Sequence, residues 1–348
     1  MHGSPLAETA ASPLSRLPAV AERSAADAAA LDALLRGARE PFVLRGLVAD
    51  WPLVRAGLES PRAARAYLLE RAREVPFTVS IGEPGHDGRM FYDAAMGMNF
   101  RMARGRLADI FAGIDANEGR ADAPTIYLAS IDVPGHFTTV DAENSVELGD
   151  RDPLASLWIG TPTTIAAHND FPDNLACCVA GRRRFTLFPP DQFANLYLGP
   201  VDNTPAGRAV SMVDFRVPDF AAHPRFAAAL EQAQVAELEP GDALFVPSMW
   251  WHHVEGLAPF NILLNYWWRD TPRWLGQPQD ALNHAMLAIR DLPAADKAIW
   301  RELFDHYVFD NGPLVTDHIP VGARGVLDPL TAESAGRLRA FLLRTLSR

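Results

Sequence analysis

The feature that most constrains the fold is a series of short β-rich runs in the middle of the 348-residue chain. Each run is bounded by Gly, Pro, Asp or Asn, which are the residues that turns favour. Strands at this spacing, with turn signals between them, predict a β-sandwich or barrel. The runs are SLWIGTPTTIAAH, NLACCVAGRRRFTLFPP, AQVAELEPGDALFVP, WWHHVEGL and FNILLNYWW.

Helical and mixed segments flank this β-rich region. Residues 1–24 are rich in Ala, Ser and Pro, and we expect them to be loosely held. Three runs after Thr271 carry apolar residues at three- and four-residue spacing and predict amphipathic helices at 277–292, 294–309 and 331–346. Before the β-rich region, the patterns predict helices at Ala25–Arg39 and Leu107–Ile114 and strands at Pro41–Leu47, Val75–Gly82, Gly88–Asp93 and Pro124–Ser130.

Composition and charge restrict the class of protein. Hydrophobic residues make up 48% and charged residues 22% of the chain, as in a globular protein with a sizeable core. The net charge of −11 disfavours a nucleic acid as the main partner. The two cysteines, Cys177 and Cys178, are adjacent, and a disulfide between them would be strained, which fits a reducing compartment. Because we find neither a secretory signal nor an apolar run of ~20 residues, we expect a cytoplasmic protein that does not bind membranes.

The strongest chemical signal is the tripeptide HND at 168–170, followed much later by WWHH at 250–253. On a strand, His168 and Asp170 are two residues apart and point to the same side. A histidine from a distant strand would complete three ligands on one face of a metal ion, leaving the open positions that a non-haem Fe(II) oxygenase needs. Taken alone, the tripeptide is more often a hydrogen-bonded His–Asp pair near a turn than a metal site.

Three blocks of the sequence, in order, resemble a known family. HNDFPDNLACCVAGRRRFTLFPP, PGDALFVPSMWWHHVEG and NILLNYWW look like the JmjC, or cupin-like, 2-oxoglutarate oxygenases, and by motif the asparaginyl hydroxylases of the factor-inhibiting-HIF type. The resemblance implies a mainly β fold with flanking helices, built on a double-stranded β-helix, or jelly-roll, core at about 124–268. That core would lie in an oxygenase domain at 25–272 with N-terminal α/β elements, followed by a C-terminal helical region at 273–348.

The resemblance also implies a ligand set and cofactors. His168 and Asp170 match the first two iron ligands of the family, and the first histidine after the paired tryptophans, His252, matches the third. His253 would then point the other way, although a shift of strand register would exchange the two. The implied cofactors are Fe(II), O₂ and 2-oxoglutarate, the last as co-substrate.

A cation is expected to bind the far carboxylate of 2-oxoglutarate. Strand alternation in GRRRFTLFPP places Arg183 on the same face as Phe185 and Leu187, where a guanidinium is costly to bury without an anion. We therefore predict Arg183 as the carboxylate clamp; the alternative is that all three arginines are solvated. The relatives resembled here carry lysine at the position of Arg183 and threonine at the position of Ile165. These differences leave open a different keto acid, or one bound in a different position.

Four further residues match co-substrate positions of the family. Tyr127 corresponds to a tyrosine whose hydroxyl binds the same carboxylate, and Asn174 and Asn265 correspond to polar residues beside the co-substrate. Trp267 shares a strand face with Asn265 and is expected to look into the barrel. The alternatives are a turn role for Asn174 and core packing for Tyr127 and Trp267.

These assignments predict an Fe(II)- and 2-oxoglutarate-dependent hydroxylase that acts on a C–H bond of a protein side chain or small molecule and releases succinate and CO₂. The alternatives are a metal-dependent cupin enzyme that does not use 2-oxoglutarate, and a non-catalytic cupin-fold binding or sensor protein. The resemblance further implies a homodimer formed through the C-terminal helices, which could instead simply pack on the barrel.

Overall fold

The computed structural model describes residues 13–347 and divides the chain into two compact units, Met1–Arg269 and Asp270–Arg348. Of the segment expected to be loosely held, residues 1–12 lie outside this description. The rest of that segment joins the fold, because strand β1 (Ala21–Arg23) pairs in parallel with β2 (Phe42–Leu44). Just before β1, the backbone N–H of Val20 donates to the carbonyl of Val235 at 2.8 Å. These backbone hydrogen bonds hold a sequence that has no apolar periodicity of its own.

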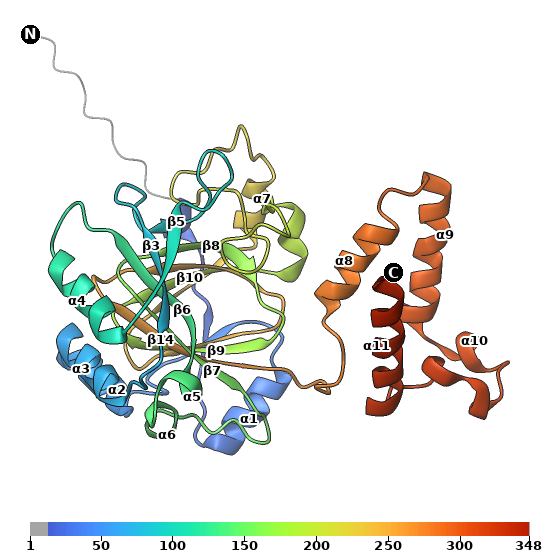
Figure 1. The fold of residues 1–348 in the computed structure, drawn as a ribbon, viewed down its shortest axis with the longest axis horizontal. Helices are drawn as coiled ribbons and strands as arrows, with labels where there is room; N and C mark the ends of the chain where they lie inside the picture. Colours follow the sequence, from blue (N-terminus) through green and yellow to red (C-terminus); the bar gives the residue numbers. More distant parts are fainter. Residues whose placement is uncertain (1–12, 348) are drawn as a thin grey trace, which may run out of the picture. The chain divides into compact units, whose positions relative to one another are not determined.

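Two sheets form the first unit (Figure 1). The larger has nine strands in the order β1, β2, β12 (Ala243–Val246), β9 (Asp173–Ala180), β14 (Asn261–Trp268), β7 (Leu154–Gly160), β6 (Thr125–Asp132), β3 (Phe77–Gly82) and β5 (Phe100–Gly105). The smaller has five strands in the order β11 (Gln234–Leu238), β10 (Arg183–Phe188), β13 (Trp251–Gly256), β8 (Thr164–Asn169) and β4 (Arg89–Met90).

Alternation along the strands divides the core into an inner and an outer part. Cys178 and Leu263 pack with Phe185 of the smaller sheet, so these side chains fill the space between the two sheets. Their neighbours Cys177 and Leu264 point the other way and pack with the helices that cover the larger sheet. The predicted fold class, a jelly-roll core with flanking helices, is therefore confirmed.

Helices cover the outer faces of the sheets (Figure 1). The larger sheet carries α1 (Ala28–Gly37), α2 (Pro52–Glu59), α3 (Pro61–Arg71), α4 (Leu107–Asn117), α5 (Val133–His136) and α6 (Val140–Glu143), while α7 (Phe226–Glu231) and the 3₁₀ helix η2 (Pro190–Ala194) belong with the smaller sheet. Side-chain caps begin two of them. Asp27 accepts from the backbone N–H of Ala30 at 2.8 Å in α1, and Ser60 accepts from that of Ala63 at 3.0 Å in α3.

Some elements carry no clear signal in the sequence. Strand β5 exposes Arg101, Met102 and Arg104, so its pattern is not that of a half-buried strand. It forms because its backbone pairs with β3 along six residues, a tertiary contact that local sequence does not report. Helix α3 was likewise not predicted, since its buried residues include Arg65 as well as Leu68.

The second unit is helical. It contains α8 (Pro278–Ala288), α9 (Ala294–Phe304), the π-helical turn η3 (Asp305–Asp310), α10 (Pro313–Thr316), the 3₁₀ turns η4 (Val321–Ala323) and η5 (Gly325–Leu327), and α11 (Ala332–Leu346). Thr331 and Ser334 form a capping box at the start of α11. Within the described part of this unit, the buried hydrophobic side chains are those of Val315 and Ala335. None of the helices between residues 13 and 347 has the length and apolar character that crossing a membrane requires.

Candidate active site

Two antiparallel strands and the turn after one of them bring three metal-binding side chains together. His168 on β8 lies directly opposite His252 on β13, and their ring centroids are 4.4 Å apart. Asp170 follows the end of β8, and its Oδ2 is 3.6 Å from Nε2 of His252. One ligand atom from each residue lies within 4.8 Å of the others, so the three can hold one metal ion. We call these three residues the triad.

Backbone carbonyls set the proton position on both imidazoles. Nδ1 of His168 lies 2.9 Å from the carbonyl oxygen of Ala166, and Nδ1 of His252 lies 3.0 Å from that of Trp250. Because a carbonyl oxygen only accepts, each Nδ1 carries the proton and donates. Each Nε2 therefore presents a lone pair. Two imidazole nitrogens with one carboxylate are the donor set of non-haem Fe(II) sites, so the residues present fit this metal.

Burial and neighbouring charges favour the protonation states that metal binding requires. Burial, with a contribution from His252, lowers the pKa of His168 to about 4, so this imidazole is neutral at physiological pH. Burial opposes ionisation of Asp170, but the contact with His252 and the charges of His168 and Arg208 outweigh it. The pKa of Asp170 is lowered to about 2. At neutral pH, His168 is therefore a neutral ligand and Asp170 an anionic one.

The second histidine of the pair lies on the other face of β13. His253 is 3% exposed, and its ring packs against Phe215 with the centroids 4.6 Å apart. Both of its ring nitrogens are buried without a hydrogen-bond partner among residues 13–347. The structure thus separates the pair: His252 lies with His168 and Asp170, and His253 lies outside the pocket.

The triad opens into a cavity of about 330 Å³ between the two sheets. Its walls are mostly apolar, with few polar side chains, as is usual for small-molecule sites. Arg183, Tyr127, Asn174 and Trp267, which sequence reasoning selected, line this cavity, and so does Ile165. The remaining lining residues are Ser80, Met90, Phe100, Ala129, Ser130, Trp158, Phe185, Pro205, Ala206, Val254 and Leu263.

Arg183 is a buried cation without a matching anion. Its side chain is 2% exposed, and Nη2 donates to the carbonyl oxygen of Trp158 at 3.2 Å. Within residues 13–347 its Nε has no partner and no carboxylate forms an ion pair with the guanidinium. Burial lowers the pKa of Arg183, and the facing Tyr127 phenol, whose own pKa burial raises to about 12, stays protonated as a donor. Where Arg183 and Tyr127 line the cavity, it therefore offers a cationic guanidinium and a neutral phenol as hydrogen-bond donors.

The flanking arginines have a different environment. Arg184 donates to Glu237 at 2.6 Å, and Arg182 lies 3.3 Å from Glu239. Both arginines are partly or fully exposed, in contrast to Arg183. Strand alternation thus separates one buried guanidinium from two that are paired near the surface.

Asn265 lies behind the cavity wall instead of on it. It is 1% exposed, its Oδ1 accepts from the indole Nε1 of Trp158 at 2.8 Å, and its Nδ2 donates to Oδ1 of Asn174 at 3.1 Å. Asn265 is not among the residues that line the cavity, although it is hydrogen-bonded to two that are, and its contact with the co-substrate stays a prediction. Trp267 packs edge-to-face against Trp158 at 5.6 Å, and in the described chain its buried Nε1 has no partner.

Sequence reasoning missed two residues of this site. Trp158 lines the cavity from β7, and the charge of Arg208 acts on both His168 and Asp170. The signal for Trp158 was available, since it alternates with Ser156 and Gly160 along a predicted strand. Arg208 lies in the long connection between η2 and α7, where no periodicity marks individual side chains.

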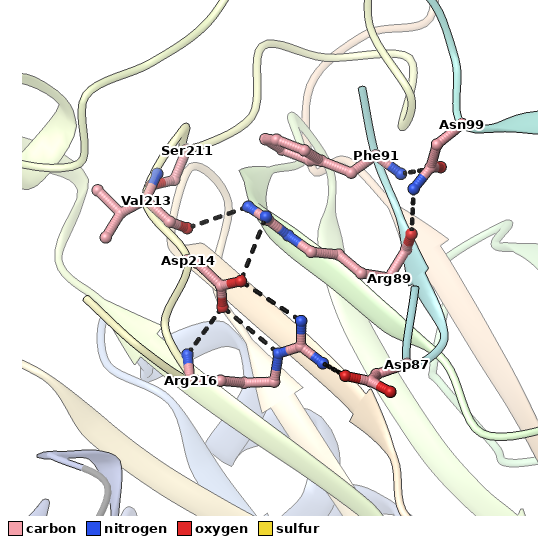
Figure 2. Close-up of polar contacts among 8 residues, drawn as sticks. All are labelled: Asp87, Arg89, Phe91, Asn99, Ser211, Val213, Asp214 and Arg216. Atoms are coloured by element: carbon pink, nitrogen blue, oxygen red, sulfur yellow. Dashed lines mark hydrogen bonds and ion pairs between the residues drawn. The ribbon is translucent and has the colours of Figure 1, made fainter. Parts of the chain in front are cut away.

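Figure 2 shows a polar network around Arg89, Asp214 and Arg216, none of which lines the cavity. Met90 lines the cavity from β4, and the adjacent Arg89 points outward, where its Nη1 lies 3.4 Å from Oδ2 of Asp214. Arg216 shares the same carboxylate at 3.4 Å. The amide of Asn99 donates to the carbonyl oxygen of Arg89 at 2.8 Å. The contact between Arg89 and Asp214 connects β4 to the segment that follows residues 205–206. Met90 on β4 and residues 205–206 both line the cavity, so the network joins two parts of the chain that form its wall.

Comparison with known families agrees with the fold. Residues 28–273 match the cupin-like domain family. Because this match covers well over half of the chain, the chain belongs to the cupin-like domain family, and the JmjC or cupin-like family predicted from the sequence is confirmed.

Curated relatives include proteins of several kinds. The chain is 31% identical over 140 residues to human HSPB1-associated protein 1, which is 38% of this chain and 27% of that protein. It is 33% identical over 105 residues to the Arabidopsis thaliana lysine-specific demethylase JMJ31, or 30% and 19% of the two chains. It is 33% identical over 132 residues to the Gallus gallus tRNA wybutosine-synthesizing protein 5, or 38% and 37%. The aligned segments thus cover well under half of the relatives' own length.

Proposed function

We propose that this protein is an Fe(II)- and 2-oxoglutarate-dependent oxygenase that hydroxylates a C–H bond of a protein side chain or small molecule. In this reaction 2-oxoglutarate, O₂ and the substrate become succinate, CO₂ and the hydroxylated product. The observation that carries the proposal is Arg183: a guanidinium 2% exposed, with its Nε unpartnered among the described residues, lining the same cavity as the triad. A buried cation next to a metal site calls for an anionic ligand that reaches both.

The proposed roles follow from the donors that the cavity offers. His168, Asp170 and His252 would hold iron, which when bound would supply the activation of O₂. Arg183 and Tyr127 would bind the far carboxylate, because the guanidinium and the protonated phenol both donate. Trp267 presents a buried, unpartnered indole N–H within the described chain, a further donor for an acceptor-rich ligand. The apolar walls would exclude water from the reacting atoms.

The substrate class rests on charge and on the cavity. The net charge of −11 and the mostly apolar lining support a protein side chain or small molecule over a nucleic acid. One relative is named as a tRNA wybutosine-synthesizing protein, so transfer RNA belongs among the substrates to be tested. We also propose a cytoplasmic location, which the two free cysteines support.

The test is turnover of 2-oxoglutarate by the full-length chain. Protein loaded with Fe(II) is incubated with 2-oxoglutarate, ascorbate and cell extract, and succinate and products heavier by one oxygen atom are measured by mass spectrometry. We expect succinate formation that Asp170→Ala abolishes. Transfer RNA replaces the extract in a parallel reaction, and oxygen incorporation there alone would contradict the proposed substrate class.

The same assay separates the two alternatives. A metal-dependent cupin enzyme without 2-oxoglutarate would turn over a substrate with no succinate, and Arg183 would have no ligand. A binding or sensor protein would hold the metal and produce neither succinate nor an oxidised product. Either result would replace the proposed reaction.

We further propose that the chain forms a homodimer through its C-terminal helices. The second unit exposes large apolar side chains, among them Phe309 at 73%, Leu314 at 85% and Leu343 at 64%, while few of its described apolar side chains are buried. Helical units of this kind are usually completed by association. Sedimentation should show a dimer for the wild type and a monomer for Leu343→Glu, with the exposed Arg337→Glu as control. A monomeric wild type would contradict the proposal.

A further inference from the structure

The orientation of two side-chain amides beside the metal cavity depends on one tryptophan. The indole Nε1 of Trp158 donates to Oδ1 of Asn265 at 2.8 Å, and Nδ2 of Asn265 donates to Oδ1 of Asn174 at 3.1 Å. Trp158 and Asn174 line the cavity, and Asn265, 1% exposed, connects them from behind. We call this chain of hydrogen bonds the amide relay.

Hydrogen-bond polarity along the relay can run in one direction only. An indole N–H donates and cannot accept, so the atom of Asn265 that faces it must be the carbonyl oxygen. The NH₂ group of Asn265 must then face Asn174, and since that group only donates, Asn174 turns its own carbonyl oxygen toward it. The NH₂ group of Asn174 is left over, and no acceptor among the described residues takes it.

We infer that Trp158 is a positioning residue, which acts through Asn265 to make Asn174 present its NH₂ donor to the co-substrate. The inference rests on the proposed function, because the donor needs an oxygen-rich ligand in the cavity. It assigns Asn265 a role without ligand contact. An amide that is not held in this orientation must be turned when the ligand binds, because its carbonyl oxygen would repel an anion, and this ordering costs binding free energy.

Trp158→Phe tests the relay with little change of shape. Phenylalanine keeps an aromatic ring against Trp267 but removes the indole N–H. Losing one buried hydrogen bond and freeing the amides should raise the Kd for 2-oxoglutarate about five- to tenfold. The Kd is measured by anaerobic titration of the Fe(II)-loaded, full-length protein. In turnover, the KM for 2-oxoglutarate should rise while kcat at saturation stays unchanged.

A matched control separates the relay from loss of a buried tryptophan. Trp51 is 7% exposed, and its indole donates to the carbonyl oxygen of Ser145 at 3.1 Å, in the core cluster away from the cavity. Trp51→Phe should lower stability and leave the Kd for 2-oxoglutarate unchanged. Fe(II) affinity should be the same in both variants, because neither touches the triad.

A double-mutant cycle decides whether Trp158 acts through Asn174. If it does, Trp158→Phe combined with Asn174→Ala should bind 2-oxoglutarate no more weakly than Asn174→Ala alone. Additive losses would overturn the inference, and so would a Kd for Trp158→Phe equal to that of the wild type. Should Trp158→Phe not fold, Asn265→Ala breaks the relay at its middle and must show the same loss. A wild type that binds Fe(II) but no 2-oxoglutarate would refute the proposed function itself, which is a different result.

Discussion

Replacing Arg183 by methionine separates a structural role of this residue from a ligand-binding role. Methionine keeps a long unbranched side chain but removes the charge. Arg183 is 2% exposed, and its Nη2 donates to the carbonyl oxygen of Trp158 at 3.2 Å, with no carboxylate partner among the described residues. In the ligand-free protein its desolvation is poorly compensated, so Arg183→Met should leave the free energy of unfolding within about 1 kcal/mol of wild type, or raise it.

Ligand binding should respond in the opposite way. Truncating one partner of a buried, hydrogen-bonded charge pair costs about 2–5 kcal/mol, which is a ~30- to ~5000-fold higher Kd for 2-oxoglutarate. Thermal unfolding of the Fe(II)-loaded protein without oxygen measures both effects. At a 2-oxoglutarate concentration of ~100 times the Kd, the wild type gains about 2.7 kcal/mol, or roughly 4–5 °C in Tm for a chain of this length. At that concentration Arg183→Met should gain at most about 0.9 kcal/mol, a third of the wild-type gain.

One outcome would refute this reasoning. If Arg183→Met unfolds many degrees below the wild type without ligand, and still gains stability with 2-oxoglutarate, Arg183 is a structural residue and the carboxylate binds elsewhere. Arg184→Met is the matched control, because Arg184 pairs with Glu237 near the surface and should not affect the gain in Tm.

Three further predictions concern the triad, a buried phenol and a close helix contact. In a metal titration, Asp170→Ala should weaken Fe(II) binding by more than the ~10–100-fold typical of changes outside the ligand set. The control Asp109→Ala, at an exposed position, should not weaken it. Equal Fe(II) affinities of Asp170→Ala and the wild type would contradict the triad. The pKa of Tyr127 is raised to about 12 in the folded state, so the stability it contributes is present below pH 10 and lost as the pH rises toward 12. Between pH 8 and pH 11, the free energy of unfolding of Tyr127→Phe should therefore fall by about 1.4 kcal/mol less than that of the wild type, as measured in denaturant titrations. Equal decreases in the two proteins would contradict a buried, protonated Tyr127 phenol. A Cβ on Gly57 in α2 would lie 2.7 Å from a carbonyl oxygen of β9, so Gly57→Ala should lower the free energy of unfolding by about 1–3 kcal/mol, although alanine has the better helix propensity. Gly37→Ala is the control and should not lower it, because the space around Gly37 is open. A lower Tm for Gly37→Ala than for Gly57→Ala would contradict this prediction.

The parts of the fold predicted from the sequence are those with a local period. Helix α1, strand β3 and the alternating strands of the jelly roll follow from apolar spacing and turn residues, because burial on one face repeats along each element. Strand β5 and helix α3 do not follow, since β5 is held by pairing with β3 and α3 buries Arg65 beside apolar residues. Tertiary pairing decides such elements, and one sequence does not report it.

The site shows the same division between local and tertiary information. His168 lies near the end of β8 and Asp170 directly after it, so their proximity follows from the two-residue spacing of the tripeptide itself. That His252, and not His253, joins them depends on the pairing of β13 with β8, which only the structure supplies. The hydrogen bonds of Asn265 to Trp158 and Asn174 likewise depend on tertiary pairing of strands, which one sequence does not report.

The most direct test of the central claim is whether Fe(II) and 2-oxoglutarate bind to the same cavity as one system. Anaerobic titrations of the full-length protein give the Kd for 2-oxoglutarate with and without Fe(II), and the Kd for Fe(II) with and without 2-oxoglutarate. We predict that each ligand tightens the binding of the other by the same factor, as linkage requires, and that Asp170→Ala and Arg183→Met both abolish this coupling. Binding of 2-oxoglutarate that is indifferent to iron, or coupling that survives in either variant, would contradict it.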